Sequence, residues 1–239
     1  MKARIAIVSF VVVLLSFLAG NSYAVMHRVW FNAWTQKEID PTGAAVKKLI
    51  VYVEVFDDEK SHPPDFVSAV KITAPDGSIF YLDLSKDWLP WDKAFWKAFS
   101  ATDFVGGVIP SGKYYAKVVP DVGSVIVELD DVTASYLAVP VVTYPKLGAT
   151  GVPQTPTFTW NAVTGATYYR IMLVNDSWQE PVYYSSFRTK YTDFTTYTIP
   201  PGDLKPNCNY RMRIEARSGS QDMDMRSRST WINFTTGNW

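Results

Sequence analysis

The chain has 239 residues with 23 basic and 23 acidic side chains, so it lacks the basic excess of a general nucleic-acid binder. Its one cysteine, Cys208, excludes an intramolecular disulfide and a cysteine zinc cluster. The thiol of Cys208 is either a half-buried small apolar group or a means of pairing with a second chain.

Residues 1–24 have the pattern of an export signal. Lys2 and Arg4 give a basic start, residues 5–20 form an apolar run, and residues 22–24 are a small-x-small cleavage site. An uncleaved membrane anchor is the alternative, but the run is shorter than the roughly 20 residues that cross a bilayer comfortably. We expect cleavage after Ala24, no membrane segment in the mature chain, and a secreted, periplasmic or cell-surface protein.

Residues 25–140 contain a series of short strands. The clearest is 48–56, where Leu49, Val51, Val53 and Val55 alternate with the side chains of the opposite face. Further strands are expected at residues 27–34, 67–73, 78–84, 113–119, 124–129 and 136–142. Short strands without long helices between them indicate an antiparallel β-sandwich.

Turn chemistry supports this interpretation. Residues 74–77, Ala-Pro-Asp-Gly, predict a hairpin turn in which proline presets φ and Gly77 takes a positive φ. Residues 110–115, Pro-Ser-Gly-Lys-Tyr-Tyr, followed by Pro-Asp-Val-Gly at 120–123, resemble the penultimate strand of immunoglobulin-like domains and the turn after it. The resemblance implies an immunoglobulin-like sandwich for residues 25–140.

One segment, residues 87–99, departs from the strand pattern. Trp91, Phe95 and Phe99 are spaced four apart, and Trp88 and Trp96 lie close to the same face of a helical wheel. The spacing predicts one short helix inserted in the first sandwich. A helix this short is stable only when docked, so its aromatic stripe either closes the first core or forms a surface for a partner.

Residues 141–239 carry a more specific resemblance. The run 145–160, then Gly-Ala-Thr-Tyr-Tyr-Arg at 165–170, resembles the opening of fibronectin type III-like domains of bacterial surface and secreted proteins. Residues 204–210 place a leucine six residues before Tyr210, the tyrosine-corner arrangement, and residues 231–236 resemble the last strand of the family. The resemblance implies a second sandwich, with a predicted core of Trp160, Tyr169, Ile171, Leu173, Ile214 and Phe234.

The outward side chains of this second part form a candidate binding surface. The fibronectin type III-like topology implies that the strand of Arg170 neighbours the strand of Arg211, Arg213 and Arg217, with Trp231 beside them. These arginines and Trp231 are candidates for an alternating arginine–tryptophan ladder held by cation–π contacts. A solvated charged face is the favoured interpretation.

The sequence carries no recognisable catalytic or cofactor motif. Only His27 and His62 supply imidazoles, and neither is accompanied by a nucleophile motif such as Gly-x-Ser-x-Gly. Acidic runs at residues 57–59 and 130–131 offer oxygen ligands of the kind calcium prefers, but such runs are usually only solvated. We therefore predict no metal, no cofactor and no enzymatic activity, with a secreted carboxylate-based hydrolase as the less favoured alternative.

The favoured interpretation is an all-β, secreted, non-catalytic protein of two antiparallel sandwich domains, 25–140 and 141–239, that works by binding or display. Its partner would be a protein or a polysaccharide. The alternative is a carbohydrate-binding accessory module that uses the aromatic segment 88–99. The candidate ligand-binding residues of these two interpretations are Trp88, Trp91, Trp96, Arg211, Arg213 and Trp231.

Overall fold

A computed structural model of the chain describes residues 26–40, 42–57, 66–90, 92–176, 194–219 and 225–238. In these ranges the regular structure is β-strand, with two short 3₁₀ turns, η2 (Ala101–Asp103) and η3 (Val105–Gly107), and no α-helix. The predicted all-β fold class is therefore confirmed. The proposed export signal, residues 1–24, lies outside the described residues.

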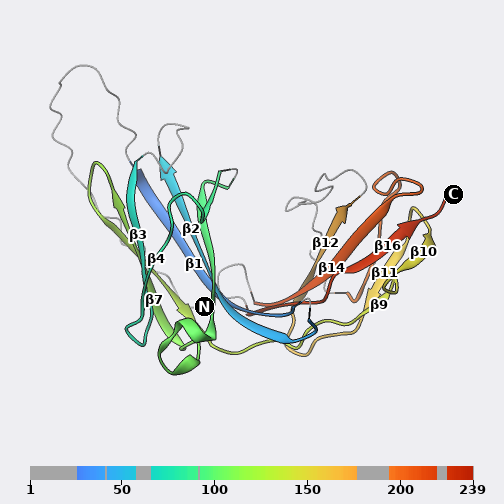
Figure 1. Ribbon diagram of the computed structural model, residues 1–239, viewed down its shortest axis with the longest axis horizontal. Helices are drawn as coiled ribbons and strands as arrows, with labels where there is room; N and C mark the ends of the chain where they lie inside the picture. The colour runs from blue at the N-terminus through green and yellow to red at the C-terminus, as the bar shows by residue number, and fades with distance from the viewer. Residues whose placement is uncertain are drawn as a thin grey trace, which may run out of the picture.

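The strands fall into two groups, one around each of two hydrophobic cores (Figure 1). Around the first core lie β1 (Met26–Ile39), β2 (Ala45–Asp57), β3 (Val67–Thr73), β4 (Ile79–Tyr81), β5 (Trp88–Leu89), β6 (Ala94–Ser100), β7 (Gly112–Pro120) and β8 (Ile126–Val132). Around the second lie β9 (Val142–Tyr144), β10 (Ala149–Val152), β11 (Thr157–Trp160), β12 (Tyr168–Asn175), β13 (Thr196–Thr198), β14 (Asn209–Ser218), β15 (Met225–Arg228) and β16 (Ile232–Thr236).

One large sheet passes through both groups. Its strand order is β10-β16-β14-β15-β1-β2-β6-β5, and β12 pairs with β14 in addition. A sheet of order β4-β3-β7-β8 covers the first core, and a sheet of order β13-β11-β9 covers the second. Figure 1 shows β1 and β2 on one side and β12 and β14 on the other facing the space between the two halves, with the smaller sheets on the outside.

The long antiparallel pair β1–β2 makes this continuity possible. Its register runs from Met26 opposite Asp57 to Ile39 opposite Ala45. Near its end, β1 also pairs in parallel with β15, where Gln36 lies beside Arg226. Backbone pairing thus crosses the predicted boundary at residue 140, and the division into two domains stays a prediction.

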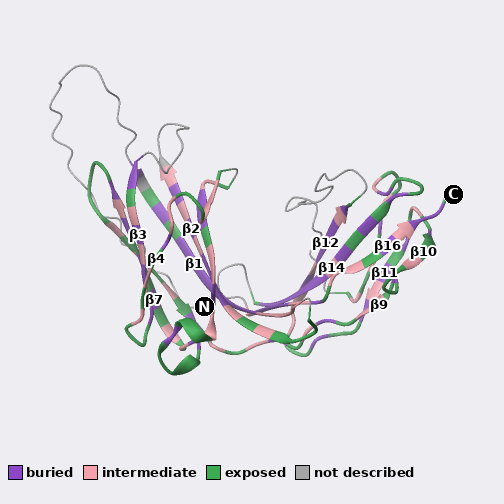
Figure 2. Ribbon diagram, in the orientation of Figure 1, coloured by how far each residue is buried: buried purple, intermediate pink, exposed green. Residues whose placement is uncertain are grey.

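Strict alternation builds the first core. Leu49, Val51, Val53 and Val55 of β2 are all buried, as the spacing predicted. The facing sheet contributes the inward-pointing residues of β3 and β7 to the same core. The second core contains every residue that the sequence assigned to it, including Trp160 and Phe234. Figure 2 shows buried stretches along β1, β2 and β14.

The helix predicted for residues 88–99 is wrong. Trp88–Leu89 and Ala94–Ser100 are instead the paired strands β5 and β6, in which Trp88 lies opposite Phe95. A spacing of four residues fits a helix, but it also fits a strand, where positions four apart share a face. Phe95 and Phe99 point into the first core and Trp96 points away from it, because β6 pairs with β2 over its whole length.

Each half contains a tyrosine whose hydroxyl bonds to nearby backbone. Tyr210 accepts a hydrogen bond from the backbone N–H of Lys205 at 2.7 Å, the predicted tyrosine corner. In the first half the hydroxyl of Tyr114 donates to the carbonyl of Pro110 at 2.8 Å. The predicted hairpin turn at residues 74–77 is also present, with Gly77 at φ 86°.

Candidate functional site on the large sheet

The face of the large sheet that points away from both cores carries four of the candidate residues, Trp96, Arg211, Arg213 and Trp231. We call it the non-core face. On β1 it carries Trp30, Asn32, Trp34, Gln36 and Glu38, the positions that alternate with core residues. The register continues it through Tyr52 of β2, Trp96 of β6, Arg226 and Arg228 of β15, Arg211, Arg213, Glu215 and Arg217 of β14, and Arg170 of β12.

Aromatic side chains cover the non-core face beside the first core. Tyr52 lies opposite Trp96, and the rings of Trp30 and Tyr52 meet edge to face at 6.1 Å with an interplanar angle of 73°. Trp30 and Trp96 are 39% and 38% exposed, which is high for indole rings on a sheet. Burial, with the charges of Asp92 and Glu54, raises the pKa of Tyr52, so its phenol stays protonated and can donate a hydrogen bond.

Arginine and tryptophan side chains cover the same face beside the second core. The guanidinium carbons of Arg211 and Arg213 lie 5.1 Å and 4.4 Å from the centroid of the Trp231 ring. The structure thus brings the candidate residues Arg211, Arg213 and Trp231 together. Arg211 also pairs with Asp176 at 3.1 Å, which fixes the ladder's outer end.

A fully buried carboxylate anchors the arginines deeper in this face. Glu215 is 0% exposed, and its two oxygens meet Arg217 and Arg228 at 2.5 Å each. Burial alone would raise the pKa of Glu215, but the charges of Arg228, Arg217, Arg226 and Arg170 hold it well below the usual range. Glu215 is therefore ionised, and it holds the surrounding guanidinium groups in place.

A second acidic residue extends the cluster to the strands of the first half. Glu38 pairs with Lys48 and accepts a hydrogen bond from the amide of Gln36 at 3.0 Å. Burial would raise the pKa of Glu38, but Lys48, Arg228 and Arg213 lower it. The charged network on the non-core face is thus continuous from β14 to β2.

The predicted tryptophans separate in the structure. Trp88 is half-buried against the first core, where its ring lies 5.0 Å from that of Phe95. Trp96 lies on the opposite face of the same sheet, and Trp91 is outside the described residues. Trp88 and Trp96 therefore do not share a platform.

Sequence reasoning missed Trp30, Trp34, Tyr52, Glu215 and Arg226. The sequence shows that Arg211, Arg213 and Glu215 alternate with apolar residues along one strand. Which side chains of other strands lie beside them depends on how the strands pair. The parallel contact of β1 with β15 brings Trp34 and Arg226 together across 192 positions of the chain, with a ring-to-guanidinium distance of 3.7 Å. Local patterns carry no signal for such a contact.

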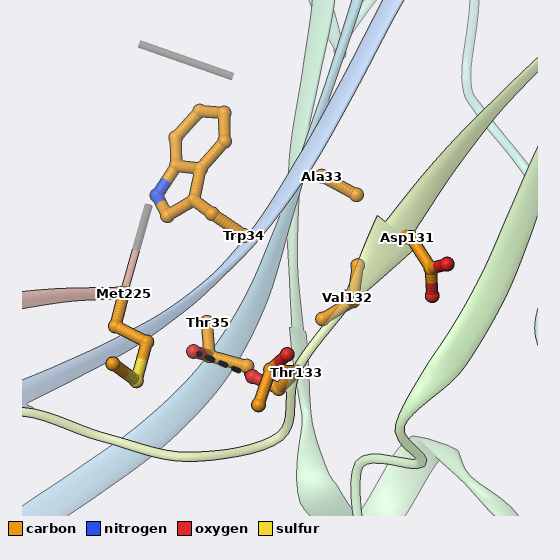
Figure 3. Close-up of a pocket in the computed structure, with 7 residues that line it drawn as sticks. All are labelled: Ala33, Trp34, Thr35, Asp131, Val132, Thr133 and Met225. Carbon is orange, nitrogen blue, oxygen red and sulfur yellow. Dashed lines mark hydrogen bonds between the residues drawn. The ribbon is translucent and has the colours of Figure 1, made fainter. Parts of the chain in front are cut away.

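A small pocket lies where β1, the end of β8 and β15 meet (Figure 3). It is lined by Ala33, Trp34, Thr35, Asp131, Val132, Thr133 and Met225. The hydroxyl of Thr35 donates to the carbonyl of Ser135 at 2.7 Å and is turned toward Thr133. Among the described residues that line it, Asp131 is the only titratable side chain.

Asp130 of the acidic run 130–131 has a structural role. The carboxylate of Asp130 accepts the backbone N–H of Ala33 at 2.7 Å, which ties β8 to β1. In the described ranges no three His, Cys, Asp or Glu side chains gather as a metal site would require. Asp58 and Glu59 of the other acidic run, and the imidazoles of His27 and His62, lie outside what the structure describes.

No helix in the described part of the chain is long and apolar enough to span a membrane.

Comparison with known proteins gives structural neighbours only. No family model matches the sequence, and no curated protein is similar to it. The chain is similar to the fibronectin(III)-like modules of Clostridium thermocellum CbhA, with 14% identity over 88% of this chain and 94% of that chain and a TM-score of 0.26. It is also similar to the FN1–FN3 domains of chicken CNTN1, with 13% identity over 85% and 67% of the two chains and a TM-score of 0.28.

A third neighbour is an immunoglobulin structure, Dpr11 IG1 bound to DIP-gamma IG+IG2, with 8% identity over 88% of this chain and 100% of that chain and a TM-score of 0.24. These three structures are thus a fibronectin(III)-like, a fibronectin and an immunoglobulin structure.

Proposed function

We propose that this protein is an exported, non-catalytic binding protein whose contact surface for a partner protein is the non-core face of the large sheet. In this proposal residues 25–140 and 141–239 are two sandwich domains, and the large sheet presents one face shared by both. The observation that carries the proposal is the composition of that face, where partly exposed Trp30, Trp96 and Tyr52 are followed by the ladder of Arg211, Arg213 and Trp231.

These residue types support a protein partner. Tryptophan, tyrosine and arginine supply most of the binding energy at protein interfaces, because they offer large contact areas with a polar end. Trp30 and Trp96 offer indole faces, and Arg211 has a side chain that is 44% exposed. A partner that covers them would gain apolar contact and hydrogen bonds together.

The rigidity of the face also supports binding. Glu215 fixes Arg217 and Arg228, while Trp231 restricts the guanidinium groups of Arg211 and Arg213. Side chains already held in place lose less conformational entropy when a partner binds.

Carbohydrate binding is the second candidate, and the exposed indoles of Trp30 and Trp96 favour it. A flat indole can cover the C–H face of a sugar ring. However, Trp30 and Tyr52 stand at 73° to each other, and Trp88 points into the first core, so these rings form no extended flat strip. The uneven surface fits a protein better than a polysaccharide chain.

The test is a binding screen of the chain from residue 25 onward against a glycan array and against extracellular proteins. For a partner so found, we expect the double variant Trp30→Ala/Trp96→Ala to weaken binding at least tenfold, a loss of about 1.4 kcal/mol. Tyr144→Ala is the matched control, because Tyr144 is 36% exposed on a different sheet. Full binding by the double variant and by Arg213→Ala would overturn the proposal.

A further inference from the structure

The strand β8 has its polarity reversed. Its outward residues Val127 and Leu129 are 55% and 52% exposed, while Glu128 and Asp130 alternate with them and point inward. Asp130 uses its inward position to accept the backbone N–H of Ala33. A surface strand usually carries polar residues outward, and a patch of exposed apolar side chains is typical of an interaction site.

The outward apolar residues continue across the whole sheet β4-β3-β7-β8. Strand register places them in two rows that run perpendicular to the strands. One row is Tyr81, Lys71, Lys117 and Val127, and the other is Ile79, Thr73, Tyr115 and Leu129. Tyr81, Ile79 and Tyr115 are 66%, 50% and 39% exposed. Both rows therefore end in exposed apolar or aromatic side chains, and Tyr115 adds another inside the second row. We call these eight residues the lysine face.

Two lysines lie directly opposite each other in the first row. Lys71 pairs in register with Lys117, and among the described residues neither makes an ion pair. Like charges placed opposite each other on one face of a sheet destabilise it. A carboxylate supplied from outside would remove that repulsion, and the apolar residues on either side would contact the groups that flank it.

We propose that the lysine face docks a partner polypeptide that presents Asp or Glu side chains between apolar residues. Charge complementarity selects this occupant. A second copy of the chain bound by a two-fold axis would bring this lysine-bearing surface against itself, which is electrostatically unfavourable.

The lysine face is separate from the non-core face, because the first core lies between the two sheets that carry them. The chain can therefore hold two partners at once, one on each side of this sandwich. This inference does not depend on the partner proposed for the non-core face.

A library of random twelve-residue peptides displayed on phage, selected against the chain from residue 25 onward, tests the proposal. We expect the recovered peptides to carry Asp or Glu between apolar residues. Synthetic copies should bind at least tenfold more weakly to Lys71→Glu, Lys117→Glu and Leu129→Asp. Lys71→Glu places opposite charges across the strand pair, so its fold should be kept, and circular dichroism checks this.

Two controls separate this face from the rest of the molecule. Lys146→Glu reverses an exposed charge beside the second core and should leave peptide binding unchanged, as should Trp96→Ala on the non-core face. The double variant Lys71→Glu/Lys117→Glu should prefer basic peptides. Failure to enrich any peptide, enrichment of basic peptides by the native chain, or binding that survives both single lysine reversals would overturn the proposal. Concentration-dependent dimers that Leu129→Asp abolishes would overturn it in favour of a second copy.

Discussion

The guanidinium carbon of Arg226 lies 3.7 Å from the centroid of the Trp34 ring, so a side chain of the second half stacks on a side chain of the first. The two side chains are 8% and 6% exposed. A cation–π contact removed from water is stronger than one on the surface. This contact, beside the parallel pairing of β1 with β15, joins the two halves of the large sheet.

A double-mutant cycle of Trp34→Ala and Arg226→Ala should therefore show a favourable coupling of about 1–2 kcal/mol in urea unfolding. Trp34→Ala alone should cost about 3–5 kcal/mol, as truncations of large buried side chains do. The matched control is the pair Arg28 and Phe56, at 4.2 Å on the more exposed part of the same face. Its coupling should stay near 0.5–1 kcal/mol. Equal couplings in the two cycles would contradict the assignment of Arg226 to a desolvated contact.

Removing the charge of Glu215 should destabilise the protein strongly. Glu215→Gln leaves the buried guanidinium of Arg217 without its counter-charge, which costs about 3–5 kcal/mol for a buried ion pair. Asp176→Asn is the matched control, since its pair with Arg211 is exposed and should contribute less than about 1 kcal/mol. Chemical denaturation of both variants gives the two values. A similar small loss in each would mean that Glu215 is not the anchor of the cluster.

The lowered pKa of Glu215 also predicts how stability depends on pH. A carboxylate whose pKa is lower in the folded chain than in the unfolded one stabilises the fold above the unfolded value of about 4.3. That contribution is lost as the pH falls from about 4.3 toward the folded pKa, and Glu38 acts in the same direction. Urea unfolding between pH 7 and pH 2.5 should show this loss, and Glu215→Gln should flatten it. An unchanged slope in the variant would contradict the prediction.

The sequence predicted those parts of the fold that depend on local alternation and on short motifs. Leu49, Val51, Val53 and Val55 were placed on the buried face because side chains along a strand alternate with a period of two. The hydrogen-bonded tyrosine corner of Tyr210 was predicted because its motif is local. The ladder of Arg211, Arg213 and Trp231 followed from the fibronectin type III-like resemblance, which supplies strand neighbours.

The features that the sequence did not predict correctly all depend on contacts between strands that are distant in the chain. The helix predicted for residues 88–99 was wrong because the spacing of Phe95 and Phe99 fits both periods, and pairing with β2 decided between them. The reversed polarity of Val127 and Asp130 could not be read from the strand itself, because the inward carboxylate is stabilised by the distant N–H of Ala33. Trp34 and Arg226 likewise meet only through long-range pairing.

The thiol of Cys208 should be slow to react in the folded protein. Cys208 is 7% exposed, and its backbone N–H donates to the hydroxyl of Thr236 at 3.0 Å, which holds the segment against β16. Pairing with a second chain would need this segment to open. We expect monomers in non-reducing electrophoresis and rapid labelling by a thiol reagent only in denaturant. Rapid labelling of the native chain, or a dimer that Cys208→Ser abolishes, would show that the thiol is accessible.

The buried hydroxyls of Tyr114 and Tyr210 offer a matched test of the two cores. Tyr114 and Tyr210 are buried, and each hydroxyl makes one short hydrogen bond to nearby backbone, at 2.8 Å and 2.7 Å. Replacing either by phenylalanine keeps the ring and removes that bond, so each variant should lose about 0.5–1.5 kcal/mol of unfolding free energy. Because the tyrosines belong to different cores, the losses should add in the double variant to within about 0.5 kcal/mol. Tyr115→Phe is the control, since Tyr115 is 39% exposed on the outer side of β7 and should lose less than either. Urea unfolding of the four variants gives the values, and a double variant that departs from the sum by more than 1 kcal/mol would contradict the independence of the two cores.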